Sequence, residues 1–423
     1  MFRFIQSHYC KSGTHKQVKQ IWKRRRTTTT MNNMNISQYM NTLGQSIMRD
    51  YRIVYFGTDA FALPILEQLH EHTEHEIALV VVPYKPHGNG QRSVVEKYAQ
   101  KHKLPIQRVN RKTTMNYFHL NTTPEQIIEP IQEPSTSKEY KLYKDNEEKP
   151  YDIGVVASFR YLMKPHVFEH FKYGCVNIHP SALPQFRGPA PITHTVWRGE
   201  KFTKVSLINL APKFDTGSII RQSPFIEISA MIDYPSFFNM LAYEGAVLLS
   251  ELLELPGTEL QQAIEAAVPQ NDPNLLVEPG VTLKDKPQEE IIFARKPRNE
   301  DGYINFAEKT ASEIYHQFKA LYTSLPHVYT YLKDTRINFH DMQLILQQEH
   351  HLDVLLQNYP DIKPGQCIFD RKQKQLLVCC KDRTLLAIHA LSKPNRKPTK
   401  SGDFLAQVPK EAKLNRTCFF FDV

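Results

Sequence analysis

Short β-prone apolar runs alternate with helical patterns over residues 52–209, and this alternation constrains the fold more than any other feature. The first run, 52–56, stops at Gly57-Thr58-Asp59, and a helical pattern follows it. A β-prone run that ends at a glycine turn and leads into a helix is how a doubly wound α/β unit begins. The sequence therefore predicts an α/β fold, a Rossmann-like domain with a mostly parallel sheet. The later runs expected as strands are 77–82, 153–157, 175–179 and 205–209.

The pattern changes after residue 293. A short helical pattern at 310–321 precedes several β-prone runs that charged turns separate. Short strands with regular turns predict a small C-terminal β-barrel of the OB-like type. The expected organisation is a leader (1–49), a catalytic domain (50–255) with an exposed insertion (110–150), a linker (256–292) and the barrel (293–423).

The charge is unevenly distributed along the chain. Residues 1–49 contain nine Lys or Arg and no Asp or Glu, whereas residues 293–423 contain 20 basic and 14 acidic residues. A basic, acid-free N-terminus that is rich in Ser and Thr is typical of a mitochondrial import segment, and a solvated basic tail is the alternative. A basic terminal domain suits a nucleic-acid partner.

Composition excludes several classes of protein. No apolar run approaches the roughly 20 residues that span a bilayer, so no membrane partner is expected. The six cysteines form no C-x-x-C pair and no ligand spacing, so we expect no metal and no disulfide framework. Gly57-Thr58-Asp59 lacks the G-x-G-x-x-G cradle of dinucleotide enzymes, which argues against hydride transfer. Nothing in the sequence indicates more than a monomer.

The densest group of functional residue types follows the run at 175–179. Asn177 and His179 are two residues apart at the end of this predicted strand, so their side chains share a face. Ligands of open α/β sheets bind at the carboxyl ends of the strands. Asp215, in the turn Lys213-Phe214-Asp215-Thr216-Gly217, is far enough along the chain to return to the same edge. The alternatives are a buried histidine and an aspartate that only forms a turn.

This pattern resembles a known family. The segment Asn177-Ile178-His179-Pro180-Ser181-Ala182-Leu183-Pro184, continued by Gln185-Phe186-Arg187-Gly188 and later by Asp215-Thr216-Gly217, is similar to formyltransferases that use 10-formyltetrahydrofolate. The order of parts and the basic second domain fit best the branch that acts on methionyl-tRNA. The resemblance covers roughly 50–423 without the insertion.

The resemblance implies a role for each motif. Asn177 and His179 would donate hydrogen bonds to the oxyanion that forms on the formyl carbon, and Asp215 would orient His179 and help accept the proton of the amine. The segment that would position 10-formyltetrahydrofolate, the formyl donor, consists of Ser181, Ala182, Leu183 and Pro184. The alternative for Ser181 is a serine that caps the loop.

The implied partner is the initiator methionyl-tRNA. In the family, the loop after the second strand is implicated in gripping the tRNA acceptor end, and here that loop carries Lys85 and Arg92. In the basic C-terminal stretch 392–400, the candidates for tRNA phosphates are Lys393, Arg396, Lys397 and Lys400. A solvated charged loop is the alternative for this stretch.

Two other functions are compatible with the sequence. The same Asn, His and Asp chemistry would serve a formyltransferase that acts on a small amine, such as a nucleotide intermediate or an amino sugar. A catalytically inactive RNA-binding relative would keep the fold and not depend on these residues.

Overall fold

The computed structural model describes most of the chain from Tyr51 to Phe421. The described ranges are 51–83, 92–109, 151–168, 171–229, 233–286, 291–345, 357, 359–371, 373–408, 413–415 and 418–421. The predicted leader and insertion lie outside these ranges. The chain divides into two compact units, 1–184 with 204–226 and 231–288, and 185–203 with 227–230 and 289–423.

A seven-stranded sheet forms the first unit, in the order β3-β2-β1-β4-β5-β7-β8. The pairs from β3 to β5 are parallel, whereas β5–β7 and β7–β8 are antiparallel. The mostly parallel α/β sheet is therefore confirmed. The strands are β1 Arg52–Gly57, β2 Glu76–Pro83, β3 Ile106–Val109, β4 Ile153–Ala157, β5 Cys175–His179, β7 Ser206–Asn209 and β8 Ile219–Gln222.

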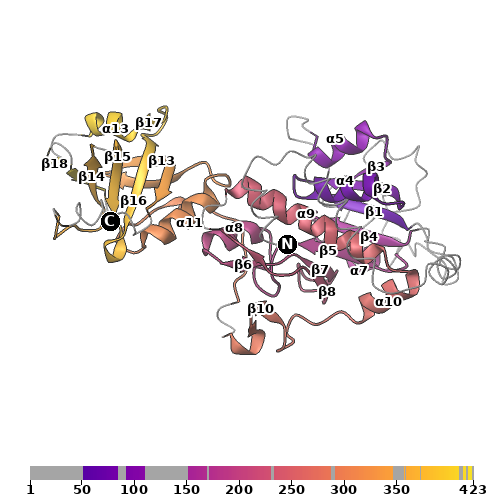
Figure 1. Ribbon diagram of the computed structural model, residues 1–423. Helices are drawn as coiled ribbons and strands as arrows, with labels where there is room; N and C mark the ends of the chain where they lie inside the picture. Colours follow the sequence, from indigo (N-terminus) through magenta and orange to yellow (C-terminus); the bar gives the residue numbers. More distant parts are fainter. Residues whose placement is uncertain are drawn as a thin grey trace, which may run out of the picture. The chain divides into compact units, whose positions relative to one another are not determined.

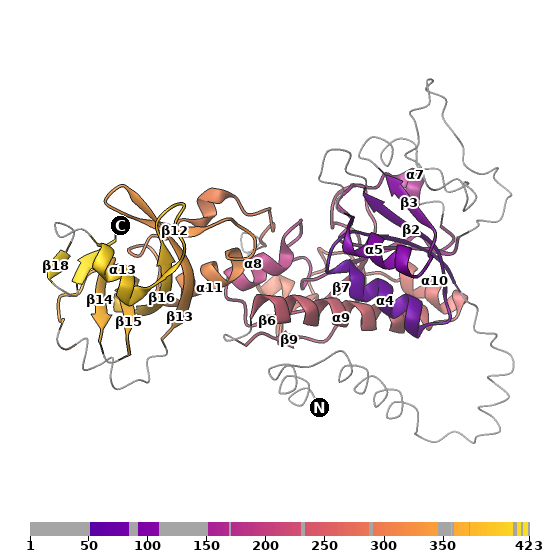
Figure 2. The same ribbon diagram turned by 90° about the horizontal axis from the view of Figure 1, so that it is seen from above.

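Helices cover both faces of this sheet. Figure 2 shows α4, α5 and α9 along one face and α7 on the other. The bounds of the helices are α4 Ala62–His72, α5 Val94–Lys101, α7 Pro165–Phe168, α9 Tyr234–Leu253 and α10 Gly257–Glu265. A Cβ at Gly245 of α9 would lie 2.8 Å from Ile178, so this glycine allows α9 to pack closely on β5. The core on the α7 side includes Phe56, Val156 and Val167.

The segment predicted as a linker, 256–292, contains ordered elements. Besides α10, it holds β10 Leu276–Glu278, β11 Val281–Thr282 and the short 3-10 helix Leu283–Asp285, and it clusters with the first unit as far as Gln288. The remaining two-residue strands are β6 Phe202–Thr203 and β9 Ile226–Glu227.

An antiparallel sheet dominates the second unit (Figure 1). Its path is β12-β13-β16-β15-β14-β19-β18, with β17 paired to β16. The predicted small β domain is confirmed, and over the described residues the hydrogen-bonded path is open between β12 and β18. The strands are β12 Val328–Leu332, β13 Thr335–Leu344, β14 Gln366–Asp370, β15 Gln375–Cys379, β16 Leu385–Ser392, β17 Thr399–Lys400, β18 Lys413–Asn415 and β19 Cys418–Phe420.

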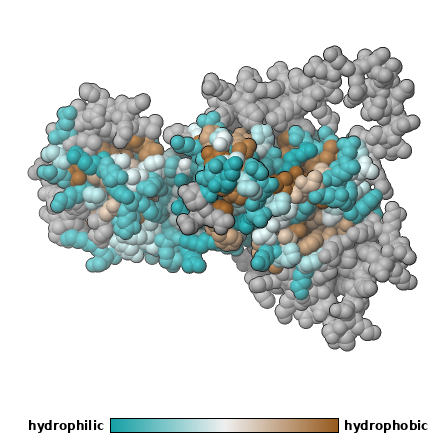
Figure 3. Space-filling model, turned by 90° about the horizontal axis from the view of Figure 1, so that it is seen from below, coloured by the Kyte–Doolittle hydropathy of each residue, from teal (hydrophilic) through white to brown (hydrophobic). Residues whose placement is uncertain are grey.

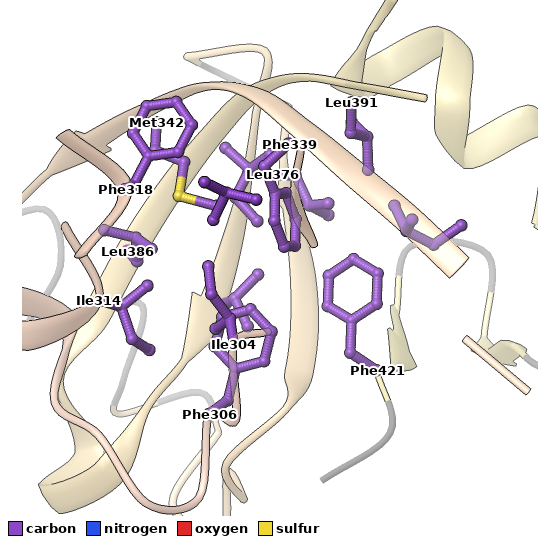
Figure 4. Close-up of a cluster of buried hydrophobic side chains, with 14 of the residues drawn as sticks. Ile304, Phe306, Ile314, Phe318, Phe339, Met342, Leu376, Leu386, Leu391 and Phe421 are labelled. Carbon is purple, nitrogen blue, oxygen red and sulfur yellow. The ribbon is translucent and has the colours of Figure 1, made fainter. Parts of the chain in front are cut away.

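The sheet of the second unit encloses an aromatic and aliphatic core. Phe306, Phe339 and Phe421 meet there (Figure 4), with Phe306 and Phe421 stacked at a centroid distance of 5.7 Å. Ile314 and Phe318 of α11 close one side of this core. The helices of this unit are α8 Pro191–Trp197, α11 Ala311–Leu321 and α13 Ser401–Gln407, with 3-10 turns at Asn299–Gly302 and Lys381–Arg383.

No described helix is long and apolar enough to cross a membrane. On the face shown in Figure 3, hydrophilic and hydrophobic side chains are interspersed over the described surface.

Candidate active site

Strand β5 carries two of the predicted catalytic residues into the interior of the first unit. All five of its residues are buried, because β4 pairs with it on one side and β7 on the other. Asn177 lies opposite Ile208 and His179 opposite Ser206, and their exposed fractions are 9% and 3%. Burial in a polar site strengthens any hydrogen bond that these side chains donate.

Asp215 completes the group from the loop between β7 and β8. Its Oδ1 accepts a hydrogen bond from Nδ2 of Asn177 at 3.3 Å and lies 3.7 Å from Nδ1 of His179. A carboxylate only accepts, so the nitrogen end of the Asn177 amide must face it. The 3.7 Å separation suits an ion pair with a protonated histidine and is too long for a good hydrogen bond. The structure therefore brings Asn177, His179 and Asp215 together.

Two backbone features hold the Asp215 loop in place. Asp215 itself has φ of +53°, a left-handed conformation that Asp adopts more readily than most residues. A Cβ added at Gly217 would overlap the carbonyl oxygen of Asn209 at the end of β7. Only glycine fits at this position, and the loop can therefore turn tightly against the strand.

Gln270 was not predicted from the sequence. Its Nε2 donates to the carbonyl oxygens of Asp215 at 2.9 Å and of Gly217 at 2.7 Å. The residue is 5% exposed and belongs to the segment that the sequence suggested was a linker. Both N–H groups of one amide therefore hold the backbone on either side of Thr216. The only sequence signal was a polar residue between Pro269 and Asn271, which does not indicate a site.

The predicted folate segment, Ser181 to Pro184, begins two residues after the end of β5 and is buried throughout. The Oγ of Ser206 donates to the Ser181 carbonyl at 2.7 Å, and Gln222 donates to the Leu183 carbonyl at 3.2 Å. The Leu183 side chain packs with Ile208 and Ile219. The backbone N–H of Leu183 donates to the Ser181 carbonyl at 3.0 Å, so the segment is fixed by internal hydrogen bonds and by this hydrophobic cluster.

Polar residues also follow the carboxyl end of β1, which lies two strands from β5 in the sheet. Thr58 is 8% exposed, and its Oγ1 has no hydrogen-bond partner among the described residues. Burial raises the pKa of the neighbouring Asp59, against the opposing effect of hydrogen bonds from Phe61 and Ser158. A buried hydroxyl without a partner is costly, so a ligand group at this edge would relieve the cost.

The predicted tRNA-binding residues fall into two groups. Lys85 lies outside the described residues, and Arg92 donates to Oε1 of Gln100 at 2.8 Å and lies 3.8 Å from Glu96. Three of the four C-terminal cations, Lys393, Arg396 and Lys397, lie on the turn that joins β16 to β17. The fourth, Lys400, lies on β17 and pairs with Ala390 of β16. Arg396, Lys397 and Lys400 are exposed and Lys393 is half-buried. In the part of the chain that the structure describes, no group of three or more His, Cys, Asp or Glu could hold a metal ion.

Comparison with known proteins identifies the family. Residues 51–250 match the formyl transferase family, and residues 296–409 match the formyl transferase C-terminal domain. The mitochondrial methionyl-tRNA formyltransferase of Bos taurus is 26% identical over 347 residues, which are 78% of this chain and 72% of that protein. The human mitochondrial protein gives the same identity and coverage. The methionyl-tRNA formyltransferase of Geobacillus thermodenitrificans is 30% identical over 246 residues, 57% of this chain and 67% of that protein.

The chain belongs to the formyl transferase family, and it is a formyltransferase with an α/β domain followed by a small β domain.

Proposed function

We propose that the protein transfers the formyl group of 10-formyltetrahydrofolate to the amino group of initiator methionyl-tRNA. The observation that carries the proposal is the cluster of Asn177, His179 and Asp215 at the carboxyl edge of the sheet, in a chain similar to the methionyl-tRNA formyltransferases of Bos taurus and Geobacillus thermodenitrificans. No covalent enzyme intermediate is required. The amine nitrogen forms a bond to the formyl carbon, the bond from that carbon to the folate nitrogen breaks, and that nitrogen gains a proton as the amine loses one.

Asn177 and His179 stabilise the oxyanion, which is the formyl oxygen that gains negative charge when the amine attacks the formyl carbon. An amide has two N–H groups, and Asp215 accepts from one of them. The second N–H and a ring N–H of His179 are the donors that we assign to the oxyanion. One such donor contributes about 3 kcal/mol to lowering a barrier of this kind, or roughly a hundredfold in rate.

Asp215 takes part in the transfer of the proton that the amine loses. Its carboxylate lies 3.7 Å from Nδ1 of His179, close enough to stabilise the positive charge that the ring gains when it takes up a proton. Because Asp215 also accepts from Asn177, one carboxylate fixes both donors. In this arrangement, the ring of His179 donates to the oxyanion, and Asp215 orients the ring, balances its charge and helps accept the proton of the amine.

The folate is assigned to the edge formed by residues 181–184 and Thr58. The segment 181–184 begins two residues after His179, so a folate held there lies near the catalytic group. The Thr58 hydroxyl, which has no partner among the described residues, suits a polar group of that ligand. The folate supplies the activated formyl group when bound, and no metal is assigned.

The tRNA is assigned to the basic groups of both domains. Its phosphates would contact Lys85 and Arg92 of the catalytic domain and the turn 393–400 of the C-terminal domain. We assign tRNA binding to the domain of residues 293–423 and targeting to residues 1–49. Mitochondrial relatives and the acid-free leader both support a place in the mitochondrial matrix.

The test compares acceptors for the formyl group. Purified protein and 10-formyltetrahydrofolate are incubated with initiator methionyl-tRNA, elongator methionyl-tRNA, free methionine and a glycinamide-type amine. The proposal expects rapid transfer to the initiator tRNA and little to the small amines. Transfer to a small amine without transfer to the tRNA would contradict the substrate and leave the chemistry standing. A reporter fused to residues 1–49, with Arg24 to Arg26 replaced by Ala as the control, tests the location.

A further inference from the structure

Three tyrosines of the second unit form a cluster on its surface. The ring centroids of Tyr329 and Tyr331 are 5.8 Å apart, and Tyr303 lies 5.9 Å from the first and 6.1 Å from the second. Tyr331 is 37% exposed, and the other two are half-buried. The alternation of β12 explains this placement, because Val328 and Leu332 point into the core and the two tyrosines point outward.

An arginine completes the cluster. The guanidinium of Arg336 lies 3.9 Å from the centroid of the Tyr329 ring, and its Nε donates to Oδ1 of Asn338 at 3.0 Å. In the register of the two strands, Arg336 pairs with Tyr331, and Asn338 pairs with Tyr329. The hydrogen bond to Asn338 of the same strand thus helps to hold the cation over the Tyr329 ring.

Hydrogen bonds to the backbone of Tyr303 and Tyr329 hold the cluster in place. Ile304 donates its N–H to the Tyr329 carbonyl at 2.8 Å, which fixes Tyr303 beside β12. The buried Gln317 of α11 donates to the carbonyls of Asp301 at 2.7 Å and of Tyr303 at 2.9 Å. Rings on a fixed backbone lose little conformational freedom when a ligand stacks on them.

The basic turn between β16 and β17 begins beside this cluster. Tyr329 pairs with Asn338, and Asn338 pairs with Ser392, the last residue of β16. These three positions form a row across adjacent strands, so the turn starts two strand spacings, about 10 Å, from Tyr329. The turn and its return, 393–400, contain four cations and no acidic residue.

We propose that this tyrosine face, defined as Tyr303, Tyr329, Tyr331 and Arg336, is a stacking platform for unpaired nucleotides of RNA. Aromatic rings stack bases of any sequence, and neighbouring cations follow the phosphates. The cations of the turn 393–400 favour a polyanion as the partner over a protein surface. The inference rests on the proposed function for the presence of an RNA substrate, and it assigns which part of the C-terminal domain takes its unpaired bases.

Fluorescence anisotropy of the full chain with RNA tests the platform. The probes are initiator tRNA, a short oligoadenylate, and an abasic oligonucleotide of the same length, which keeps the phosphates and lacks the bases. We expect Tyr331→Val and Tyr329→Val each to weaken oligoadenylate binding about tenfold and to leave abasic binding unchanged. Tyr331→Phe, which keeps the ring, should bind as wild type.

Control variants and circular dichroism distinguish a loss of RNA affinity through base stacking from a loss through charge or through misfolding. Tyr322 is 46% exposed, and its described ring contact is with Phe318, outside the platform. Tyr322→Val should therefore bind RNA normally. Lys397→Ala should weaken binding to all three probes and reduce the salt dependence, which the tyrosine variants should leave unchanged. Unchanged circular dichroism shows that each variant is folded.

Wild-type affinity of Tyr329→Val and Tyr331→Val for oligoadenylate would overturn the platform, and so would an equal loss with the abasic probe. The outcome is independent of formyl transfer. Transfer to tRNA with normal RNA binding by the tyrosine variants would refute only the platform. Base-dependent binding without transfer would refute only the proposed function.

Discussion

Replacement of Gln270 by Met tests whether the segment after α10 positions the catalytic loop. Met has nearly the same length as Gln and lacks both N–H groups, so Gln270→Met removes the hydrogen bonds to the carbonyls of Asp215 and Gly217 with little change in volume. Each such bond contributes about 1 kcal/mol net, and a buried carbonyl left without a partner costs somewhat more. We therefore expect the free energy of unfolding to fall by roughly 1–3 kcal/mol.

The effect on catalysis should exceed the effect on stability. The two bonds hold the backbone on either side of Thr216, and the Asp215 carboxylate must stay within reach of both Asn177 and His179. A displacement of about 1 Å at a reacting group can cost about a hundredfold in rate. We expect kcat for formyl transfer to fall about 10- to 100-fold, with the KM for tRNA little changed.

The matched control is Tyr51→Phe. The hydroxyl of Tyr51 donates to the Leu255 carbonyl at 2.6 Å, and the residue precedes β1, at the edge of the sheet opposite to the site. This variant loses one partly buried hydrogen bond and should lose stability without loss of kcat. Formyl-transfer kinetics and thermal unfolding are measured on both variants. If Gln270→Met loses stability and keeps wild-type kcat and pH profile, the positioning role is refuted.

Two further predictions concern the loop and the second unit. Gly217→Ala should abolish formyl transfer, because its methyl group would overlap the carbonyl oxygen of Asn209, and normal activity of a folded Gly217→Ala protein would refute the close approach. Burial lowers the pKa of His194 below 6.5, against the opposing effect of its hydrogen bond to the Arg295 carbonyl. A folded-state pKa below the unfolded one means that stability is present above about pH 6.5 and is lost as the pH falls. Between pH 7.5 and 5.5, the melting temperature of His194→Gln should therefore fall less than that of the wild type. An equal fall in both proteins would contradict the lowered pKa of His194.

The strands of the first unit could be predicted because a buried parallel strand is a short, mainly apolar run of residues bounded by turns. The run at 153–157 matches β4 and the run at 175–179 matches β5, since each is a short apolar segment between turns. Helix α8 was not among the predicted elements, because it is short and begins at Pro191. Proline is compatible with the first turn of a helix, where its missing N–H is not needed.

The site could be predicted only where its residues lie close in sequence to a recognisable motif. Asn177 and His179 share a strand, and Asp215 lies in a turn that the family resemblance singled out. Gln270 acts on backbone carbonyls 55 and 53 residues away, and such contacts leave no local pattern. The charge of the stretch 392–400 was evident, but its pairing with β16 and its position beside the tyrosines depend on strand register.

The most direct test of the account is single-turnover formyl transfer to initiator methionyl-tRNA by the full chain and its Asp215→Asn variant. Asn has the shape of Asp and lacks the charge, so the variant keeps the loop and loses the group that faces both Asn177 and His179. The account predicts normal binding of tRNA and a loss of at least a hundredfold in the rate of transfer. A variant that transfers the formyl group at the wild-type rate would contradict the assignment of this cluster as the catalytic centre.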